Sequence, residues 1–285
     1  MHDFDSSGGE PNELVQASDG NFYGTTFELG AHNAGTVFRI TRGGILTTLH
    51  NFCAQKNCAD GAEPVGRMVL ATDGNFYGMT LRGGANKDGT VFKITGGKLT
   101  TLYTFCSLAA CADGEIPDGE LTQATDGSLY GTTSSGGANG DGTVFQITTE
   151  GTLTTLHNFD LTDGNRPSSG LLQATDGKFY GTTETGGTSQ NCQGGCGTVF
   201  SVDVGLGPFV SLVRNSGRVG SPIGILGQGF TGTTDVSLNG TAASFNVVSD
   251  TYLTATVPSG ATTGFVTVTT LSGTLTSNQI FRVKP

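Results

Sequence analysis

Short runs of apolar and β-branched residues, separated by glycine-containing turns, recur along the first 200 residues of the chain. In the second copy of this pattern, the predicted strands cover residues 68–71, 76–80, 90–94 and 99–105. An Asp-Gly turn joins the first two strands and a Gly-Gly turn joins the last two, whereas the other two connections are longer. Because successive antiparallel strands alternate in direction, both short turns are expected at one face and both long loops at the other.

The pattern repeats four times with a period near fifty residues. The motif Asp-Gly-x-x-Tyr-Gly begins at Asp19, Asp73, Asp126 and Asp176, in steps of 54, 53 and 50 residues, and a Gly-Thr-Val-Phe segment follows each copy. A fixed period of this length, rich in β-formers and glycine, is typical of a blade-type or solenoid β architecture. The recurring residues are therefore interpreted as scaffold, and function is sought where the copies differ.

The two ends of the repeat region predict how the array closes. The fourth copy lacks its last strand, and the chain opens with Met1-His2-Asp3-Phe4, which matches the end of that strand at 157–159 in the third copy. We therefore predict an all-β fold containing a four-bladed β-propeller, in which the N-terminal segment supplies the outer strand of the last blade. A truncated larger propeller, with upstream repeats missing, is the alternative.

The period ends at 205–208, and residues 209–285 alternate apolar and polar positions in short segments. Strands are predicted at 223–225, 236–238, 243–247, 253–257 and 265–269. Turn signals such as Asn239-Gly240 separate them, which is typical of a small immunoglobulin-like sandwich. The predicted domains are thus a four-repeat propeller over 1–204 and a second domain over 208–285.

Composition and charge exclude several classes of partner. Only 13% of residues are charged and the net charge is −10, so a nucleic-acid partner is not expected. No run of about 18 apolar residues occurs, which excludes a transmembrane helix. No signal peptide is present at Met1. The acidic, glycine- and threonine-rich composition favours an extracellular or cell-surface protein whose export signal has been lost.

The six cysteines form three close pairs. Local disulfides that hold loops are expected, and they imply an oxidising compartment. Zinc is the competing interpretation, but the pairs lie in different repeats and none has the Cys-x-x-Cys spacing. The pairs are Cys53/Cys58, Cys106/Cys111 and Cys192/Cys196.

The motifs of both regions resemble known families. Residues 1–204 resemble the GloVer tandem repeat through Asp-Gly-x-x-Tyr-Gly-Thr-Thr followed by Gly-Gly and Gly-Thr-Val-Phe, which implies an extracellular bacterial protein without an established activity. Residues 208–285 resemble an IPT/TIG domain through 225–230, 236–240 and 255–258. That resemblance implies an immunoglobulin-like accessory module, found in surface proteins and beside catalytic domains of polysaccharide-active enzymes.

Three charged residues at the start of the first predicted strands are the candidate catalytic group. Glu13, Arg67 and Glu120 occupy equivalent positions in the first three copies, and these positions would surround the mouth of the central channel. Two carboxylates across a narrow cavity suit glycoside hydrolysis, and Arg67 would lower the pKa of the one it pairs with. The competing interpretation is a solvated rim, or an ion pair that holds blades together.

Other copy-specific polar residues are predicted on the face with the long loops. The candidate ligand-binding residues are Glu28, His32, Arg82, Arg166 and Glu184, and Glu63, Glu115 and Asp118 fall on the same face. A calcium site through Asp88 and Asp141 is a weaker alternative, because two carboxylates are too few without backbone oxygens. No other cofactor or metal is expected.

Three hypotheses of function follow from these features. The first is a secreted bacterial binding or surface-display protein that binds carbohydrate, such as a polysaccharide or cell-surface glycan, through the face with the long loops. The alternative is a glycoside hydrolase acting on polysaccharide through Glu13 and Glu120. A third is a purely structural repeat protein of a surface layer or fibre, which predicts self-association.

Overall fold

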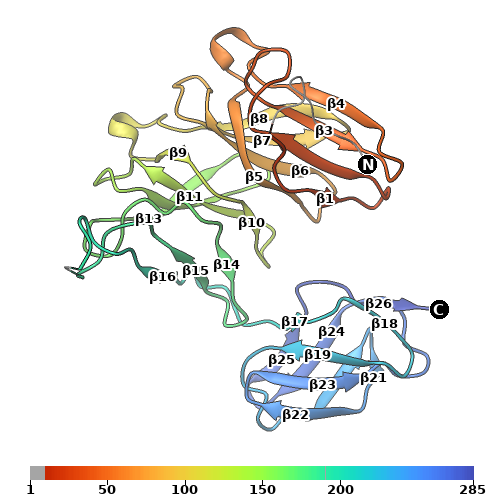
Figure 1. Cartoon of the computed structure of the whole chain (residues 1–285). Coiled ribbons are helices and arrows are strands. Elements are labelled where there is room, and N and C mark those ends of the chain that lie inside the picture. Colours follow the sequence, from red (N-terminus) through yellow and green to blue (C-terminus); the bar gives the residue numbers. More distant parts are fainter. Residues whose placement is uncertain (1–9, 190) are drawn as a thin grey trace. The chain divides into compact units, whose positions relative to one another are not determined.

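A computed structural model describes residues 10–189 and 191–285 (Figure 1). Its described part is almost entirely β-structure, with two short 3-10 turns, η1 (Lys56–Cys58) and η2 (Ala109–Cys111), and no α-helix. The all-β prediction is therefore confirmed. The chain divides into two compact units: the first extends to Leu172 and includes Tyr180–Val202, and the second comprises Gln173–Phe179 and Asp203–Pro285.

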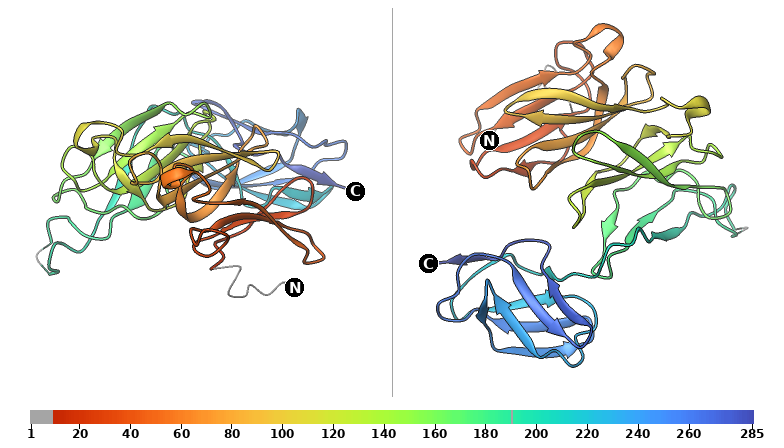
Figure 2. Two further views of the ribbon diagram at one scale, coloured as in Figure 1. Left: turned by 90° about the horizontal axis from the view of Figure 1, so that it is seen from above. Right: turned by 180° about the vertical axis from the view of Figure 1, so that it is seen from behind.

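The four repeats each form one antiparallel sheet, and the sheets follow one another in sequence order (Figures 1 and 2). The first sheet contains β1 (Val15–Gln16), β2 (Phe22–Thr26), β3 (Thr36–Ile40) and β4 (Leu46–Asn51); the second contains β5 (Ala62–Leu70), β6 (Phe76–Arg82), β7 (Thr90–Thr95) and β8 (Lys98–Thr104). The third contains β10 (Thr122–Gln123), β11 (Leu129–Ser135), β12 (Thr143–Ile147) and β13 (Leu153–Asn158), with β9 (Glu115–Pro117) on β11; the fourth contains β14 (Leu172–Gln173), β15 (Phe179–Thr182) and β16 (Val199–Val202).

The fourth sheet has three described strands, as the truncated fourth copy of the repeat predicts. Among the described strands β16 is the last of that sheet, and Val199 on it is 78% exposed. The N-terminal segment predicted to pair with this edge, Met1 to Phe4, lies outside the described residues. The closure of the ring stays a prediction.

Buried phenylalanines join each sheet to the next. Phe52 follows the outer strand of the first sheet and contacts Phe92 of the second, with ring centroids 5.2 Å apart. The same edge-to-face contact recurs at 5.2 Å between Phe105 and Phe145, and at 4.9 Å between Phe159 and Phe200. Edge-to-face aromatic pairs add stabilisation beyond that of their buried area. This recurrence explains why a phenylalanine follows the last strand of each of the first three copies and why another ends Gly-Thr-Val-Phe.

The threonines of the repeat motif form buried hydroxyl pairs between neighbouring strands. In the second sheet the Thr80 and Thr90 hydroxyl oxygens are 2.8 Å apart, and the Thr90 amide donates to the Thr80 hydroxyl at 3.2 Å. Equivalent pairs join Thr26 to Thr36 and Thr133 to Thr143. Because buried polar groups need hydrogen-bond partners, the pairs account for threonine at positions that would otherwise suit apolar residues.

The recurring aspartates hold the tight turns, as their structural interpretation predicts. Asp73 accepts the Asn75 amide at 3.0 Å and the Tyr77 hydroxyl at 2.7 Å, and its carboxylate lies 3.4 Å from the Lys93 ammonium. Burial alone would raise the pKa of Asp73, but the hydrogen bonds from Tyr77 and Asn75 outweigh it and lower the pKa to about 2.

The Asp73 turn predicts an acid-dependent part of the stability. Because its pKa lies below the ordinary value of 3.8, the carboxylate stabilises the fold above about pH 4, and this contribution is lost as the pH falls through about 2. We expect Asp73→Asn to lower the free energy of unfolding at pH 7 and to differ less from the parent at pH 2. Urea unfolding of both proteins across this range measures the difference, and a pH-independent difference would contradict the assignment.

The second unit contains two four-stranded antiparallel sheets around one core. Ile225 and Leu253 of one sheet, and Val236 and Val268 of the other, are fully buried in a single apolar cluster. A short parallel pair, β18 (Ser216–Arg218) and β26 (Arg282–Lys284), lies beside them. One sheet has the order β17 (Ser211–Leu212), β19 (Pro222–Leu226), β23 (Tyr252–Thr256) and β22 (Phe245–Ser249); the other has β21 (Thr241–Ala242), β20 (Asp235–Leu238), β24 (Val266–Thr270) and β25 (Gly273–Thr276).

Candidate functional site

The long loops of neighbouring repeats are joined by a hydrogen bond that occurs three times. The amides of Glu63, Ile116 and Arg166 donate to carbonyl oxygens of the preceding repeat, at Ala34, Asp88 and Asp141, over 2.9–3.0 Å. All three donors have positive φ angles of 55–58°. We call this surface the long-loop face; it comprises the loops 27–35, 82–89, 136–142, 183–189 and 191–198 and the linkers 52–63, 105–118 and 159–171.

A buried aspartate holds each of the first two linkers. Asp60 is 0% exposed and accepts the amides of Ala54 and Gln55, both at 3.1 Å, while the His50 imidazole lies 2.8 Å from its carboxylate. In this way one carboxylate satisfies two loop amides and ties the linker to β4. Charge-assisted hydrogen bonds of this kind are among the strong ones in proteins.

The second linker repeats this arrangement with a tyrosine in place of the histidine. Asp113 accepts the Ser107 amide at 2.9 Å, the Leu108 amide at 3.0 Å and the Tyr103 hydroxyl at 2.7 Å. Burial acts to raise the pKa of Asp113, but the hydrogen bonds outweigh it and lower that pKa; burial together with Asp113 raises the pKa of Tyr103 to about 12. The residues missed by the sequence analysis are these aspartates, although the recurring Asp-Gly at 60–61, 113–114 and 163–164 was a visible signal.

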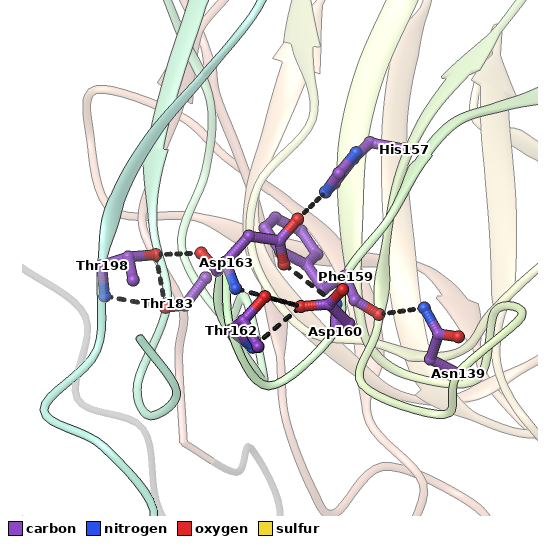
Figure 3. A network of polar contacts seen from close by, with 8 residues as sticks. All are labelled: Asn139, His157, Phe159, Asp160, Thr162, Asp163, Thr183 and Thr198. Atoms are coloured by element: carbon purple, nitrogen blue, oxygen red, sulfur yellow. Dashed lines mark hydrogen bonds and ion pairs between the residues drawn. The ribbon is translucent and has the colours of Figure 1, made fainter. Parts of the chain in front are cut away.

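The third linker carries the same aspartate at its surface (Figure 3). The His157 imidazole lies 2.8 Å from the carboxylate of Asp163, which also accepts the Asp160 amide at 2.9 Å. The Asp160 carboxylate in turn accepts the Thr162 amide, and the Thr198 hydroxyl donates to the Asp163 carbonyl oxygen. The linker is thereby attached both to β13 and to the loop before β16.

Three disulfides fasten the same loops, which confirms the disulfide prediction. Cys53–Cys58 and Cys106–Cys111 lie in the first and second linkers, and Cys192–Cys196 lies in the loop before β16. Since all six cysteines are in disulfides, none offers a thiolate to zinc.

The predicted catalytic group is only partly brought together. The Arg67 guanidinium lies 3.8 Å from one carboxylate oxygen of Glu120, and the Arg67 amide donates to the other at 3.3 Å. The Glu13 side chain is exposed, and among the described residues it has no hydrogen bond or ion pair. Glu120 is thus paired with the arginine of the neighbouring repeat, as the ion-pair interpretation of this position requires.

Three of the predicted binding residues take part in exposed ion pairs, one between β5 and β6 and one between the third linker and the loop before β16. The Arg82 guanidinium lies 3.3 Å from Glu63, and that of Arg166 lies 3.6 Å from Glu184. Both arginine side chains are about 60% exposed, at 59% and 61%. Exposed pairs of this kind contribute little to stability, so these side chains can exchange partners with a ligand at small cost.

The remaining polar residues of this face differ in their surroundings. Glu28 and His32 are exposed on the loop after β2, and no partner of either side chain is found among the described residues. Asp118 is half-buried: burial raises its pKa, the Glu184 carboxylate raises it further, and Arg166 opposes this shift. The pKa of Asp118 is therefore displaced toward the protonated form.

The group of acidic residues and cysteines around Asp88 offers few side chains that could bind a metal ion. Asp88 and Glu115 lie close to one another near Cys106 and Cys111, but both sulfurs belong to a disulfide. Two carboxylates remain, whereas calcium needs six to eight oxygens. The cluster therefore adds one carboxylate, that of Glu115, to Asp88 of the calcium alternative, which is still fewer side-chain oxygens than calcium needs.

Comparison with solved structures finds relatives of low identity. The extracellular domain of a proposed hybrid two-component system from B. thetaiotaomicron is 11% identical, with a TM-score of 0.44, over 76% of this chain and 27% of the other. The extracellular domain described as a one-component system from the same organism is 13% identical, with a TM-score of 0.44, over 99% of this chain and 38% of the other. A gluconolactonase from Xanthomonas campestris is 13% identical, with a TM-score of 0.42, over 87% and 72%. The chain thus spans well under half the length of the first two.

The remaining comparisons concern the sequence itself. No curated protein matches it, and no helix in the described part of the chain is long and apolar enough to cross a membrane. The model of the Gloeobacter/Verrucomicrobia repeat matches residues 1–200 and, in a second overlapping match, residues 110–272. These matches include all four copies of the motif, so the chain belongs to the Gloeobacter/Verrucomicrobia repeat family.

Proposed function

We propose that this chain is a secreted bacterial binding or surface-display protein that binds carbohydrate through the long-loop face. In this proposal residues 1–204 form a four-bladed propeller and residues 208–285 an immunoglobulin-like domain of the IPT/TIG type. One observation carries it: the repeats share their buried scaffold but differ in the exposed charged groups of one face. Rigid scaffolds with variable loops are a common design for binding proteins.

The construction of the long-loop face supports a binding role. The disulfides and the linker aspartates hold the loops at both ends, so little conformational entropy would be lost when a ligand binds. The two exposed arginines and their glutamate partners offer planar donors and acceptors, which suit the hydroxyl groups of a glycan. Glu28 and His32 add an acceptor and a titratable group on the first repeat.

Binding to a panel of plant and microbial polysaccharides tests this proposal. We expect Arg82→Ala and Arg166→Ala each to weaken binding by roughly tenfold, because each removes a charged donor. Lys98→Ala, an exposed lysine at the short-turn end of β8, is the matched control and should bind like the parent. Equal affinities of all four proteins, or no binding to any polysaccharide, would reject the long-loop face as the site.

A second candidate is a glycoside hydrolase that acts on polysaccharide. It is supported by the raised pKa of Asp118, because such enzymes need one carboxylic acid that stays protonated and a second, ionised carboxylate. In this candidate mechanism Asp118 is the protonated carboxylic acid. Glu13 and Glu120, the pair predicted from the sequence, are the candidates for the ionised carboxylate. Asp118 lies two residues before Glu120 in the chain, between β9 and β10 of the third sheet.

Product release from the same polysaccharides, followed by mass spectrometry, separates this candidate from a binding protein. Oligosaccharides that disappear in Asp118→Asn and in Glu13→Gln or Glu120→Gln would establish hydrolysis and locate the two groups. Asp235→Asn, an exposed carboxylate of the second unit, is the control and should retain activity. The absence of product from the parent protein would remove this candidate and leave binding.

A further inference from the structure

The positive charges of the second unit are gathered in one place. Residues 1–208 contain 10 Lys and Arg against 22 Asp and Glu, whereas residues 209–285 contain four against two. All four lie on or beside the parallel pair β18 and β26, which we call the basic ribbon (Figure 1); they are Arg214, Arg218, Arg282 and Lys284. A charge balance that differs so strongly between two parts of one chain points to an anionic partner for the positive part.

The backbone of the ribbon directs its cations to the outside. Because side chains alternate along a strand and Cα partners on neighbouring strands point the same way, Gly217 and Val283 share one face of the ribbon. Val283 packs against the core of the unit, and an aromatic ring of that core would lie 3.1 Å from a Cβ on Gly217. The opposite face, which carries Arg218, Arg282 and Lys284, is therefore turned to solvent, and all three residues are exposed.

No acidic side chain in the described part of the chain forms an ion pair with these cations. Arg218 and Lys284 are direct partners across the ribbon, where like charges repel. The two acids of residues 209–285 belong to other elements: Asp235 opens β20, and Asp250 lies in the turn between β22 and β23. Departures from favourable local charge placement are typical of functional surfaces.

A groove of about 490 Å³ continues this surface. Its polar lining includes two of the cations and three neutral hydrogen-bonding side chains: Arg214, Lys284, Asn215, Ser216 and Gln279. Asn215 and Gln279 are exposed, so their amides are accessible to a ligand. Such groups beside a cation suit a polymer that carries both hydroxyl groups and carboxylates. The described residues that line the groove include no aromatic side chain, on which the bases of single-stranded nucleic acids stack.

We propose that the outward face of the basic ribbon, together with the adjoining groove, binds an acidic polysaccharide whose sugars carry carboxylates. The carboxylates face Arg218, Arg282 and Lys284, and the hydroxyl groups of the polymer reach Asn215 and Gln279 in the groove. Each exposed charge contact is weak, so the affinity results from several contacts along one polymer. The site uses no residue of the long-loop face and does not depend on the glycan binding proposed for that face.

Calorimetric titration of the full chain with polygalacturonate, and with its methyl ester as an uncharged polymer of the same backbone, tests the proposal. We expect the acid polymer to bind and the ester to bind at least about tenfold more weakly. Arg218→Gln/Lys284→Gln should weaken binding of the acid polymer by about tenfold, because two charge-assisted contacts are lost. Arg42→Gln/Lys98→Gln, which changes the net charge equally at exposed residues of the first unit, is the matched control and should bind like the parent.

Two further measurements separate lost binding from lost folding. Thermal unfolding of Arg218→Gln/Lys284→Gln should occur at the temperature of the parent or higher, because a repulsion between neighbouring strands is removed. Raising the salt concentration from about 0.05 M to about 0.5 M should weaken binding of the acid polymer and leave that of the ester unchanged.

The variants of the two surfaces distinguish this inference from the function proposed above. Binding of polygalacturonate that is lost in Arg218→Gln/Lys284→Gln and kept in Arg82→Ala/Arg166→Ala supports the ribbon, whether or not the long-loop face binds a glycan. The reverse pattern would overturn the inference and leave the proposed function standing. Equal binding of acid and ester, no binding of polygalacturonate, or binding of phosphatidylglycerol vesicles in its place would also overturn it.

Discussion

Replacing Gly89 by alanine is expected to lower the free energy of unfolding by about 4 kcal/mol, the sum of a backbone and a packing term. Gly89 opens Gly-Thr-Val-Phe in the second copy and has a φ of +95°, which an L-residue rarely adopts. A Cβ there would also collide with the Thr80 carbonyl oxygen and lie 2.5 Å from Cδ of Pro117 in the next repeat. Neither neighbour can move without shifting backbone, so both costs apply.

The matched control for this variant is Gly74→Ala. Gly74 has a similar φ of +80°, but nothing lies within 4 Å of its Cβ position. Only the backbone term remains, and we expect a loss of about 1 kcal/mol. Urea unfolding measures both variants, and equal losses would contradict the role assigned to the contact with Pro117.

Removal of the Asp60 carboxylate is expected to have the second largest effect. Asp60→Ala leaves the amides of Ala54 and Gln55 and the ring nitrogen of His50 without their acceptor, in a site where the carboxylate is fully buried. Such unsatisfied groups typically cost 1–3 kcal/mol, so we expect a total loss of about 3 kcal/mol. Because the Cys53–Cys58 disulfide keeps the linker closed, the loss should appear as lower stability rather than as an unfolded loop.

Asp163→Ala is the matched control for Asp60→Ala. Asp163 pairs with His157 at the same 2.8 Å, but its side chain is 43% exposed instead of 0%. Water can replace the lost acceptor at the exposed site, so we expect a loss of about 1 kcal/mol. If both variants lost equal stability in urea unfolding, burial would not be what makes the Asp60 bond important.

The turn and strand pattern within each repeat was predictable because it depends on residues close in sequence. The Asp-Gly turns, the strands at 76–80 and 90–94 and the three disulfides are all present where the sequence places them. The predicted strand at 68–71 is part of a longer one that begins at Ala62. Its first half pairs with the end of β6 across a bulge, and no local signal marks this extension.

Features that join distant segments were not predictable in the same way. The parallel pairing of β18 with β26 brings together residues more than sixty positions apart, and short strands of this kind carry little periodicity. An ion pair between Arg67 and Glu120 was one interpretation of these positions, and a catalytic group was the other. The sequence could not decide between them, because the two side chains belong to different repeats. The linker aspartates were overlooked because an Asp-Gly pair is also an ordinary turn signal.

The sequence by itself determined the repeat, the all-β character and the family, because period, turn residues and alternation are properties of the chain read in order. Only the tertiary structure decided which side chains at equivalent positions of the repeat are buried and which are exposed to solvent. Asp60 and Asp163 are the clearest case: each carboxylate lies 2.8 Å from a histidine ring nitrogen, but the first side chain is 0% exposed and the second 43%. Packing between neighbouring sheets depends on the shapes of both, and neither repeat contains that information alone.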